Sequence, residues 1–208
     1  MNILDIGVDE RKNFNKDTWL TDMYNKQMEI AIKYKDIERM PDWPMSIDSR
    51  IGQVWGKDFI NRVNEELMES FESVIDPSTS VIVDGVDIHR SEELADALHF
   101  YLELLIIWGI KPIFLETCYK EYEYKEKSIN DTYLMAVYKM EQIGMKLKSK
   151  PWKQDMIKTD VTQLRNALKE AFFAILDVFR VNGDSDEDIW DLYTKKNAVN
   201  QFRQKSNY

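Results

Sequence analysis

The sequence contains few of the residues that cross-link chains or interrupt helices. A single cysteine, Cys118, excludes an internal disulfide and is typical of proteins of the reducing cytoplasm. Only seven glycines and five prolines occur among 208 residues, which favours a mostly helical chain. Because 44% of the residues are hydrophobic and 12% are aromatic, we expect an ordered domain with a core of its own.

Long apolar runs and an excess of basic charge are also missing. No apolar run reaches the roughly 18–20 residues of a membrane-spanning helix. Acidic residues interrupt the first stretch, "MNILDIGVDERKNFNK", so it does not read as a signal peptide. The 28 basic and 37 acidic residues leave a net charge of −9, which argues against general binding to nucleic-acid phosphates. We therefore expect a cytoplasmic protein that binds neither membranes nor nucleic acid.

Apolar residues recur at helical spacing along most of the chain. A third helix is expected to begin at Ser91 as its N-cap and to stop at Gly109. The segment "VIVDGVDIH" before it is too short to assign beyond a possible extended excursion, and residues 119–127 are either a solvated helix face or a loop. With no repeat, linker or domain boundary, residues 1–208 are expected to form one all-α multi-helix bundle. The other helices are expected at residues 17–40, 51–75, 129–148 and 160–181 and from about residue 186 onward.

Two pairs of acids occupy helix faces that ought to be apolar. Glu66 and Glu69 are three residues apart, as are Glu93 and Asp96, so the carboxylates of each pair point the same way. Like charges so placed repel each other unless a cation lies between them. If the two helices face each other, four carboxylates converge, and hard oxygen ligands at that density suit Mg²⁺, with Mn²⁺ as a substitute.

Other interpretations of these acids stay open. Acid pairs three residues apart are common on solvated helix faces, and Glu93 is also favourable in the first turn of a helix. Asp96-x-x-His99 matches one Glu-x-x-His element of helical di-iron proteins, but His89 has no acid three residues before it to form a second element. Asp96 lies between two alanines in an apolar segment, which favours the metal site. His99 is either a hydrogen-bonded core residue or a substrate contact.

Three motifs resemble those of the all-α nucleoside triphosphate pyrophosphatases, which include MazG-like enzymes, dimeric dUTPases and phage dCTPases. The first motif is Glu66-x-x-Glu69, then 23 intervening residues, then Glu93-x-x-Asp96. The other two, "ADALHF" and the C-terminal "YTKKNAVNQFRQKSNY", are similar to the dUTPase and dCTPase branch. Two departures concern Asn207, where the family usually has glycine, and a tryptophan-rich segment that is absent after the first acid pair.

The resemblance implies a bundle completed by homodimerisation and a Mg²⁺-dependent hydrolysis of dUTP to dUMP and pyrophosphate, for sanitation of the nucleotide pool. The alternatives are a dCTP or dual diphosphatase, a MazG-like house-cleaning enzyme and a non-catalytic helical interaction module. A phage enzyme of this kind would act in the host cytoplasm. The four acids would hold the metal, and either Glu66 or Glu69 would orient the attacking water.

The resemblance also implies how the deoxyribonucleoside triphosphate is bound. Gln27 would contact the base, although an ordinary surface glutamine is the alternative, and His99 and Phe100 would lie near the deoxyribose. In the basic tail, residues 193–208, three polar residues fall on one face of the last helix and would hold phosphate oxygens, or would merely complement the helix dipole. Tyr208 would close over the nucleotide. The three tail residues are Lys196, Asn200 and Arg203.

Overall fold

The structure is a computed structural model that describes residues 3, 6–76, 78, 81–83, 86–148 and 158–206. In these residues it contains seven α-helices and one antiparallel pair of two-residue strands, β1 (Ile82–Val83) and β2 (Val86–Asp87). The all-α bundle predicted from the sequence is confirmed. The helices are α1 (Trp19–Ile37), α2 (Arg50–Ile75), α3 (Ile88–Ile107), α4 (Ile113–Tyr119), α5 (Ile129–Lys146), α6 (Val161–Val181) and α7 (Asp186–Lys205).

Helix α3 begins one turn earlier than the sequence predicted. Its N-cap is Asp87, whose side chain accepts a hydrogen bond from the backbone N–H of Arg90 at 3.1 Å. Ser91 is instead buried inside the first turn, where its hydroxyl donates to the carbonyl of Asp87 at 2.8 Å. Serine and aspartate cap helices about equally well. Because the short strand β2 ends at Asp87, the helix begins directly after it and Asp87 is the cap. His89, expected in a loop, therefore lies in the helix.

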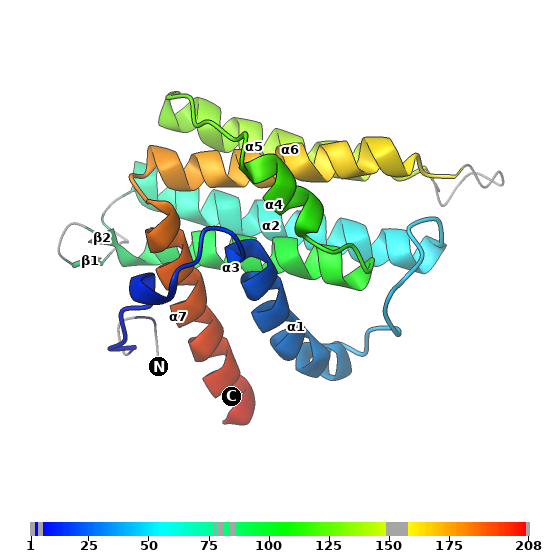
Figure 1. The fold of residues 1–208 in the computed structure, drawn as a ribbon, viewed down its shortest axis with the longest axis horizontal. Coiled ribbons are helices and arrows are strands. Elements are labelled where there is room, and N and C mark those ends of the chain that lie inside the picture. Colours follow the sequence, from blue (N-terminus) through cyan, green and yellow to red (C-terminus); the bar gives the residue numbers. More distant parts are fainter. Residues whose placement is uncertain are drawn as a thin grey trace.

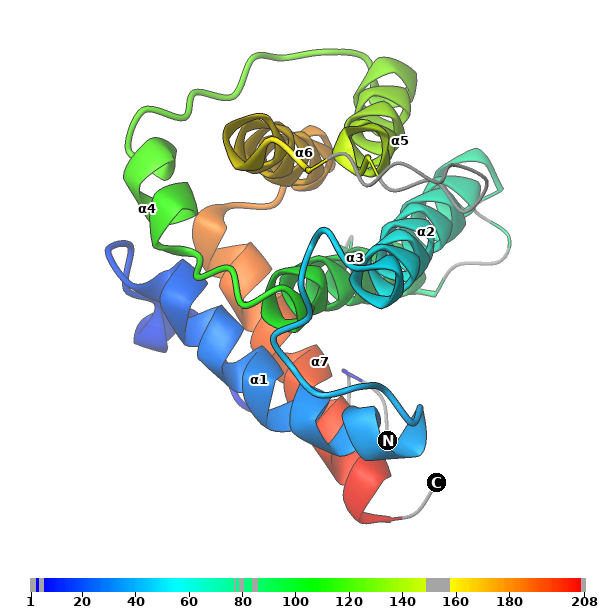
Figure 2. The ribbon, with the colours of Figure 1, turned by 90° about the vertical axis from the view of Figure 1, so that its right-hand side faces the viewer.

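Two pairs of helices form the body of the molecule, and two further helices cover one side of it. Figures 1 and 2 show α5 beside α6 and α2 beside α3, with α2 also packed against α5. Helices α1 and α7 lie next to each other against α3, and the short α4 packs on α1 and α6. Helix α3 is thus contacted by α1, α2, α6 and α7, which explains why most of its residues are buried.

The close packing of α2 on α3 depends on a glycine. A Cβ atom at Gly56 would lie 2.0 Å from Cζ2 of Trp108, which follows the end of α3. The indole N–H of Trp108 also donates to the carbonyl of Gly52 at 2.9 Å. The left-handed conformation of Gly109, with φ of 65°, ends α3 where the sequence predicted a stop. The first turns of α2 are therefore held closely against the end of α3.

The charged, tyrosine-rich segment after α4 is a loop. Tyr122 is anchored on α6, since its ring stacks on Phe173 with centroids 5.0 Å apart and its hydroxyl donates to Asp177 at 2.7 Å. Helix α4 itself was not predicted, because two turns are too short to show a helical period. None of the helices in the described ranges combines the length and the apolar composition that a membrane crossing requires.

Candidate active site

The antiparallel packing of α2 on α3 brings three of the predicted metal ligands together. One carboxylate oxygen from each of Glu66, Glu69 and Glu93 lies within 4.8 Å of the other two. Glu66 and Glu93 are half-buried, whereas Glu69 is exposed rather than set deep in an apolar face as the sequence suggested. Asp96 is likewise half-buried and not enclosed. The three members of the group found in the described part of the chain are all carboxylates, and Nδ1 of His89 lies 2.9 Å from one of them, Glu93.

These carboxylates make an environment that favours a cation. Burial, a hydrogen bond from its carboxyl to Glu93 and the nearby charge of Asp96 raise the pKa of Glu66 well above its usual range. Burial also raises the pKa of the Glu93 carboxyl, against the effects of Lys196 and of His89, whose Nδ1 lies 2.9 Å from it. Clustered carboxylate oxygens are the ligands that Mg²⁺ prefers, so these residues fit the metal.

The fourth predicted ligand is held by the last helix. Oδ2 of Asp96 lies 2.7 Å from Nζ of Lys196, a lysine that is only 5% exposed. A buried lysine requires a partner, and α7 presents it directly to the acid cluster. The structure therefore places one predicted metal ligand and one predicted phosphate ligand in contact with each other.

A pocket of about 240 Å³ opens beside Asp96, between α1, α2, α3 and α7. It gathers residues that lie as far as 176 positions apart in the sequence, counted from Gln27 to Arg203. Tyr208, the remaining residue predicted to bind substrate, lies outside the described residues, as does Asn207. Six of the predicted site residues line the pocket: Gln27, Asp96, His99, Phe100, Asn200 and Arg203.

His99 is a neutral hydrogen-bond acceptor in this pocket. Its Nδ1 lies 2.7 Å from the carbonyl of Ala95, which can only accept, so Nδ1 carries the proton. The ring stacks on Tyr193, with centroids 4.2 Å apart and an angle of 18°. Burial lowers the pKa of His99 to about 4. Its Nε2 is therefore an acceptor, and it has no partner among the described residues.

Gln27 is not a surface residue, which excludes that alternative. It is only 2% exposed, and its Nε2 donates to Oε2 of Glu103 at 3.1 Å. Its Oε1 lies 3.2 Å from the hydroxyl of Tyr193, which is also 2.9 Å from the carbonyl of Met23. The amide is thus held by α3 on one side and α7 on the other.

Glu103 is the buried residue of the pocket that the sequence analysis missed. It is 3% exposed, and burial together with the charge of Glu38 raises the pKa of its carboxyl to about 7, against Gln27 and Arg62. A signal was present, because Asp96, His99 and Glu103 follow one another at spacings of three and four and so share one helix face. Glu103 is the one acid in the apolar stretch "FYLELLIIW" and, like Asp96, it places a carboxyl in a segment that ought to be buried.

Arg62 closes the pocket on the side of α2 and was also missed. Its guanidinium makes two hydrogen bonds to Glu38, of 2.8 and 2.6 Å, and lies 2.9 Å from Asp58. It also lies over the ring of Phe100, 5.6 Å from the ring centroid. Nothing in the local sequence distinguishes this arginine from a solvated one, since its partner Glu38 is 24 residues away.

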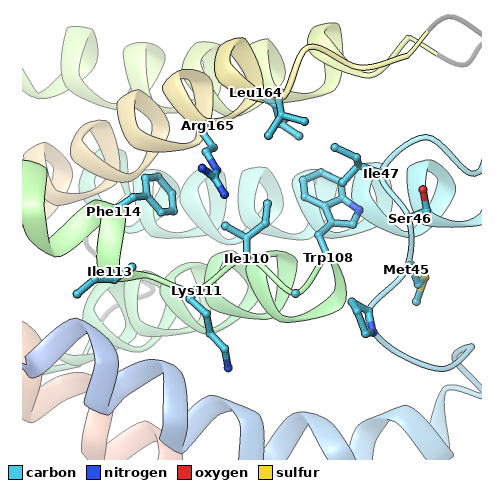
Figure 3. A pocket seen from close by; sticks show the side chains of 13 residues that line it. Met45, Ser46, Ile47, Trp108, Ile110, Lys111, Ile113, Phe114, Leu164 and Arg165 are labelled. Atoms are coloured by element: carbon cyan, nitrogen blue, oxygen red, sulfur yellow. The ribbon is translucent and has the colours of Figure 1, made fainter.

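A larger cavity, of about 600 Å³, lies away from these residues. Figure 3 shows it between the segment that joins α3 to α4 and the first turn of α6, with Trp108 and Phe114 among its walls. Its charged side chains are Lys111 and Arg165, and no acid lines it in the described residues. None of the predicted site residues lines this cavity, so its size does not mark the site.

Comparison with known proteins identifies the family of the chain. The sequence model of a family described as dUTPase matches residues 87–208, more than half of the chain. The match includes Glu93, Asp96 and the C-terminal helix, whereas Glu66 and Glu69 precede it. No curated protein and no solved structure matches the chain. The chain therefore belongs to the all-α dUTPase family, and membership implies a nucleoside triphosphate diphosphatase.

Proposed function

We propose that this protein hydrolyses dUTP to dUMP and pyrophosphate in a Mg²⁺-dependent reaction. The observation that carries the proposal is the position of the three-carboxylate group next to a pocket with a buried polar end. Asp96 connects the two, since it lines the pocket and its charge acts on Glu66 of the three-carboxylate group. A triphosphate at the acids would place its sugar and base in the pocket.

Glu66, Glu69, Glu93 and Asp96 would hold the metal, with Mn²⁺ as a possible substitute for Mg²⁺. When bound, Mg²⁺ supplies positive charge that neutralises the phosphate oxygens as the α–β anhydride bond breaks. Either Glu66 or Glu69 accepts the proton of the attacking water as a general base.

The last helix supplies the remaining positive charge for the phosphates. Lys196 exchanges Asp96 for a phosphate oxygen, and Arg203 and Asn200, which line the pocket, donate hydrogen bonds to the other oxygens. Tyr208 would close over the bound nucleotide. These contacts would explain why an acidic protein carries a basic tail, residues 193–208.

The sugar would lie against His99 and Phe100. Nε2 of His99, an acceptor without a partner in the described residues, suits a sugar hydroxyl. The ring of Phe100, which packs between Phe59 and Arg62, would fill the space beside C2′. A ribose 2′-hydroxyl would collide with it, so deoxyribonucleotides are the preferred substrates.

A dCTP or dual dCTP/dUTP diphosphatase is the second candidate. The Gln27–Glu103 pair favours it, because an amide and a carboxyl together are able to accept from and donate to either pyrimidine. We also propose that the protein acts as a homodimer in the host cytoplasm, if a phage encodes it. A sedimentation measurement that finds only monomer at micromolar concentration would exclude the dimer.

The test is pyrophosphate release from a panel of deoxyribonucleoside and ribonucleoside triphosphates, with Mg²⁺, Mn²⁺ or EDTA. Wild type should cleave dUTP only with a metal, and Glu69→Ala should abolish cleavage. Glu65→Gln is the matched control, since Glu65 is an exposed acid on α2 outside the three-carboxylate group, and it should keep full activity.

Three outcomes would contradict the proposal. Cleavage in EDTA would exclude the metal, cleavage of modified or ribose nucleotides alone would indicate a house-cleaning enzyme, and no cleavage at all would indicate a non-catalytic interaction module.

A further inference from the structure

Glu103 has a buried carboxyl that the fold only half satisfies. Oε2 accepts from the amide of Gln27, whereas Oε1 is buried with no hydrogen-bond partner in the described part of the chain. The guanidinium of Arg62, which also lines this pocket, bonds to Glu38 and Asp58. An unpaired buried carboxyl oxygen costs stability, and a ligand group that pairs with it would remove that cost.

The position of Glu103 along α3 indicates which part of a nucleotide it meets. Asp96 lies at the acid cluster, His99 and Phe100 one turn further on, and Glu103 one turn beyond them, all on the pocket side. Seven residues of helix rise about 10 Å, comparable to the distance from the phosphate of a nucleotide to the far edge of its base. A nucleotide bound along α3 with its phosphates at Asp96 therefore brings its base to Glu103.

We propose that Glu103, held by Gln27, is the residue that recognises the pyrimidine base. Its free oxygen Oε1, together with Oε2, which also accepts from Gln27, would hydrogen-bond to the edge of the ring that carries N3 and the substituent at C4. This proposal rests on the proposed nucleotide hydrolysis and extends it to a specific residue and a specific edge of the base.

The chemistry of a neutral carboxyl fits both pyrimidines. Its C=O accepts from N3–H of uracil while its O–H donates to O4; with cytosine, the C=O accepts from the C4 amine and the O–H donates to N3. Burial and the carboxylate of Glu38 favour that neutral form, against Arg62, which already bonds to Glu38 and Asp58; Arg203 also lines the pocket. We therefore expect acceptance of uracil and cytosine and rejection of a ring without a C4 substituent.

The test compares three bases with two variants. The ligands are the α,β-imido analogues of dUTP, of dCTP and of the deoxynucleotide of pyrimidin-2-one, which lacks a C4 substituent, and calorimetry measures their binding in Mg²⁺. Hydrolysis of the three corresponding triphosphates without the imido bridge is measured in parallel. Glu103→Gln keeps one donor and one acceptor, whereas Glu103→Met keeps the size of the side chain and removes both.

Wild type and Glu103→Gln should bind the uracil and cytosine analogues about tenfold or more tightly than the pyrimidin-2-one analogue. Glu103→Met should lose most of this preference, with little change for pyrimidin-2-one. A purely structural role would lower binding of all three ligands in parallel, and that result, or an unchanged preference in Glu103→Met, would overturn the proposal.

The two proposals fail in different ways. If wild type binds the analogues with the expected preference but hydrolyses no triphosphate, the proposed function is wrong and the base recognition stands. If it hydrolyses dUTP but binds the three analogues equally, the base recognition is wrong and the function stands. If no analogue binds, both are wrong.

Discussion

Lys196 and Asp96 form an ion pair of 2.7 Å that ties the last helix to the acid cluster on α3. The side chain of Lys196 is buried and that of Asp96 is half-buried, with side-chain exposures of 6% and 22%. A metal ion competes for Asp96, and a triphosphate competes for Lys196. A metal ion on Asp96 frees Lys196 for a phosphate, and a phosphate on Lys196 frees Asp96 for the metal. Because neither charge is stable alone in this position, we expect metal and nucleotide to bind cooperatively.

Replacing the lysine tests this relationship. Lys196→Met should destabilise the protein without Mg²⁺ by about 1–3 kcal/mol, because it leaves Asp96 unpaired beside other acids. Saturating Mg²⁺ should restore most of that loss, and kcat/KM for dUTP should still fall by roughly tenfold or more, since a charged contact to phosphate is missing. Thermal unfolding with and without Mg²⁺ and steady-state kinetics measure both effects.

The neighbouring lysine is the control. Lys195 pairs with Asp191 at 2.8 Å, away from the acid cluster, so Lys195→Met should not alter the response to Mg²⁺. A loss of stability in Lys196→Met that Mg²⁺ leaves unchanged would show that Asp96 takes no part in metal binding.

The acid cluster predicts a stability that depends on both pH and metal. The pKa of Glu66 is raised by burial and by the neighbouring carboxyls, so its contribution to stability is complete at low pH and is lost as pH rises through that higher value. The increase in Tm that Mg²⁺ produces should therefore be larger at pH 8 than at pH 5. Binding at a hundredfold excess over Kd stabilises by about 2.7 kcal/mol.

Glu66→Gln should remove most of this behaviour. Without Mg²⁺ the variant should melt higher than wild type at pH 8, because Glu66 must take up a proton on folding at that pH and glutamine need not, and Mg²⁺ should raise its Tm little. Glu65→Gln should behave as wild type in every condition. Equal responses of the two variants to Mg²⁺ would place the metal elsewhere.

Glu103 gives a second pH dependence, in a different range. Its carboxyl has a pKa of about 7 in the folded chain and an ordinary value of 4.5, and burial is the main cause. A carboxyl whose pKa is raised on folding makes its full contribution to stability below the ordinary pKa of 4.5. That contribution is lost as the pH rises from about 4.5 through 7. The free energy of unfolding of wild type, relative to Glu103→Gln, should fall by on the order of 2–4 kcal/mol from pH 4.5 to pH 8. A constant difference between the two proteins would mean that Glu103 stays charged throughout.

The long helices and the acid pairs could be predicted from the sequence, because they depend on short-range periods. The spacing of three aligns the carboxylates within each pair, Glu66 with Glu69 and Glu93 with Asp96. Only the antiparallel packing of α2 on α3 was then needed to bring the two pairs together. The exposure of the acids was predicted less well. Glu69 was expected on a helix face that ought to be apolar, yet its side chain is exposed. The register of a helix against its neighbours, which decides such a question, is set by the whole fold.

The walls of the pocket could not be predicted in the same way. Arg62 joins the site through Glu38, and Gln27 through Tyr193, which lies 166 residues away. Contacts between residues so far apart in the sequence depend on how α1 and α7 pack on α3. Glu103 is a different case, because its spacing from His99 was visible in the sequence and the cost of burying a carboxyl gave a reason to examine it.

Phe100 tests the proposed selection of deoxyribose. Its ring lines the pocket one turn from Asp96 and is held between Phe59 and Arg62, with its centroid 6.3 Å from that of Phe59. Phe100→Ala should therefore lower the ratio of kcat/KM for dUTP over UTP by roughly tenfold or more, because room appears beside C2′. The control is Phe114→Ala, which removes a half-buried ring from the larger cavity and should lower Tm without altering that ratio. If Phe100→Ala lowers kcat/KM for both nucleotides equally, the ring supports the fold of the pocket and takes no part in sugar selection.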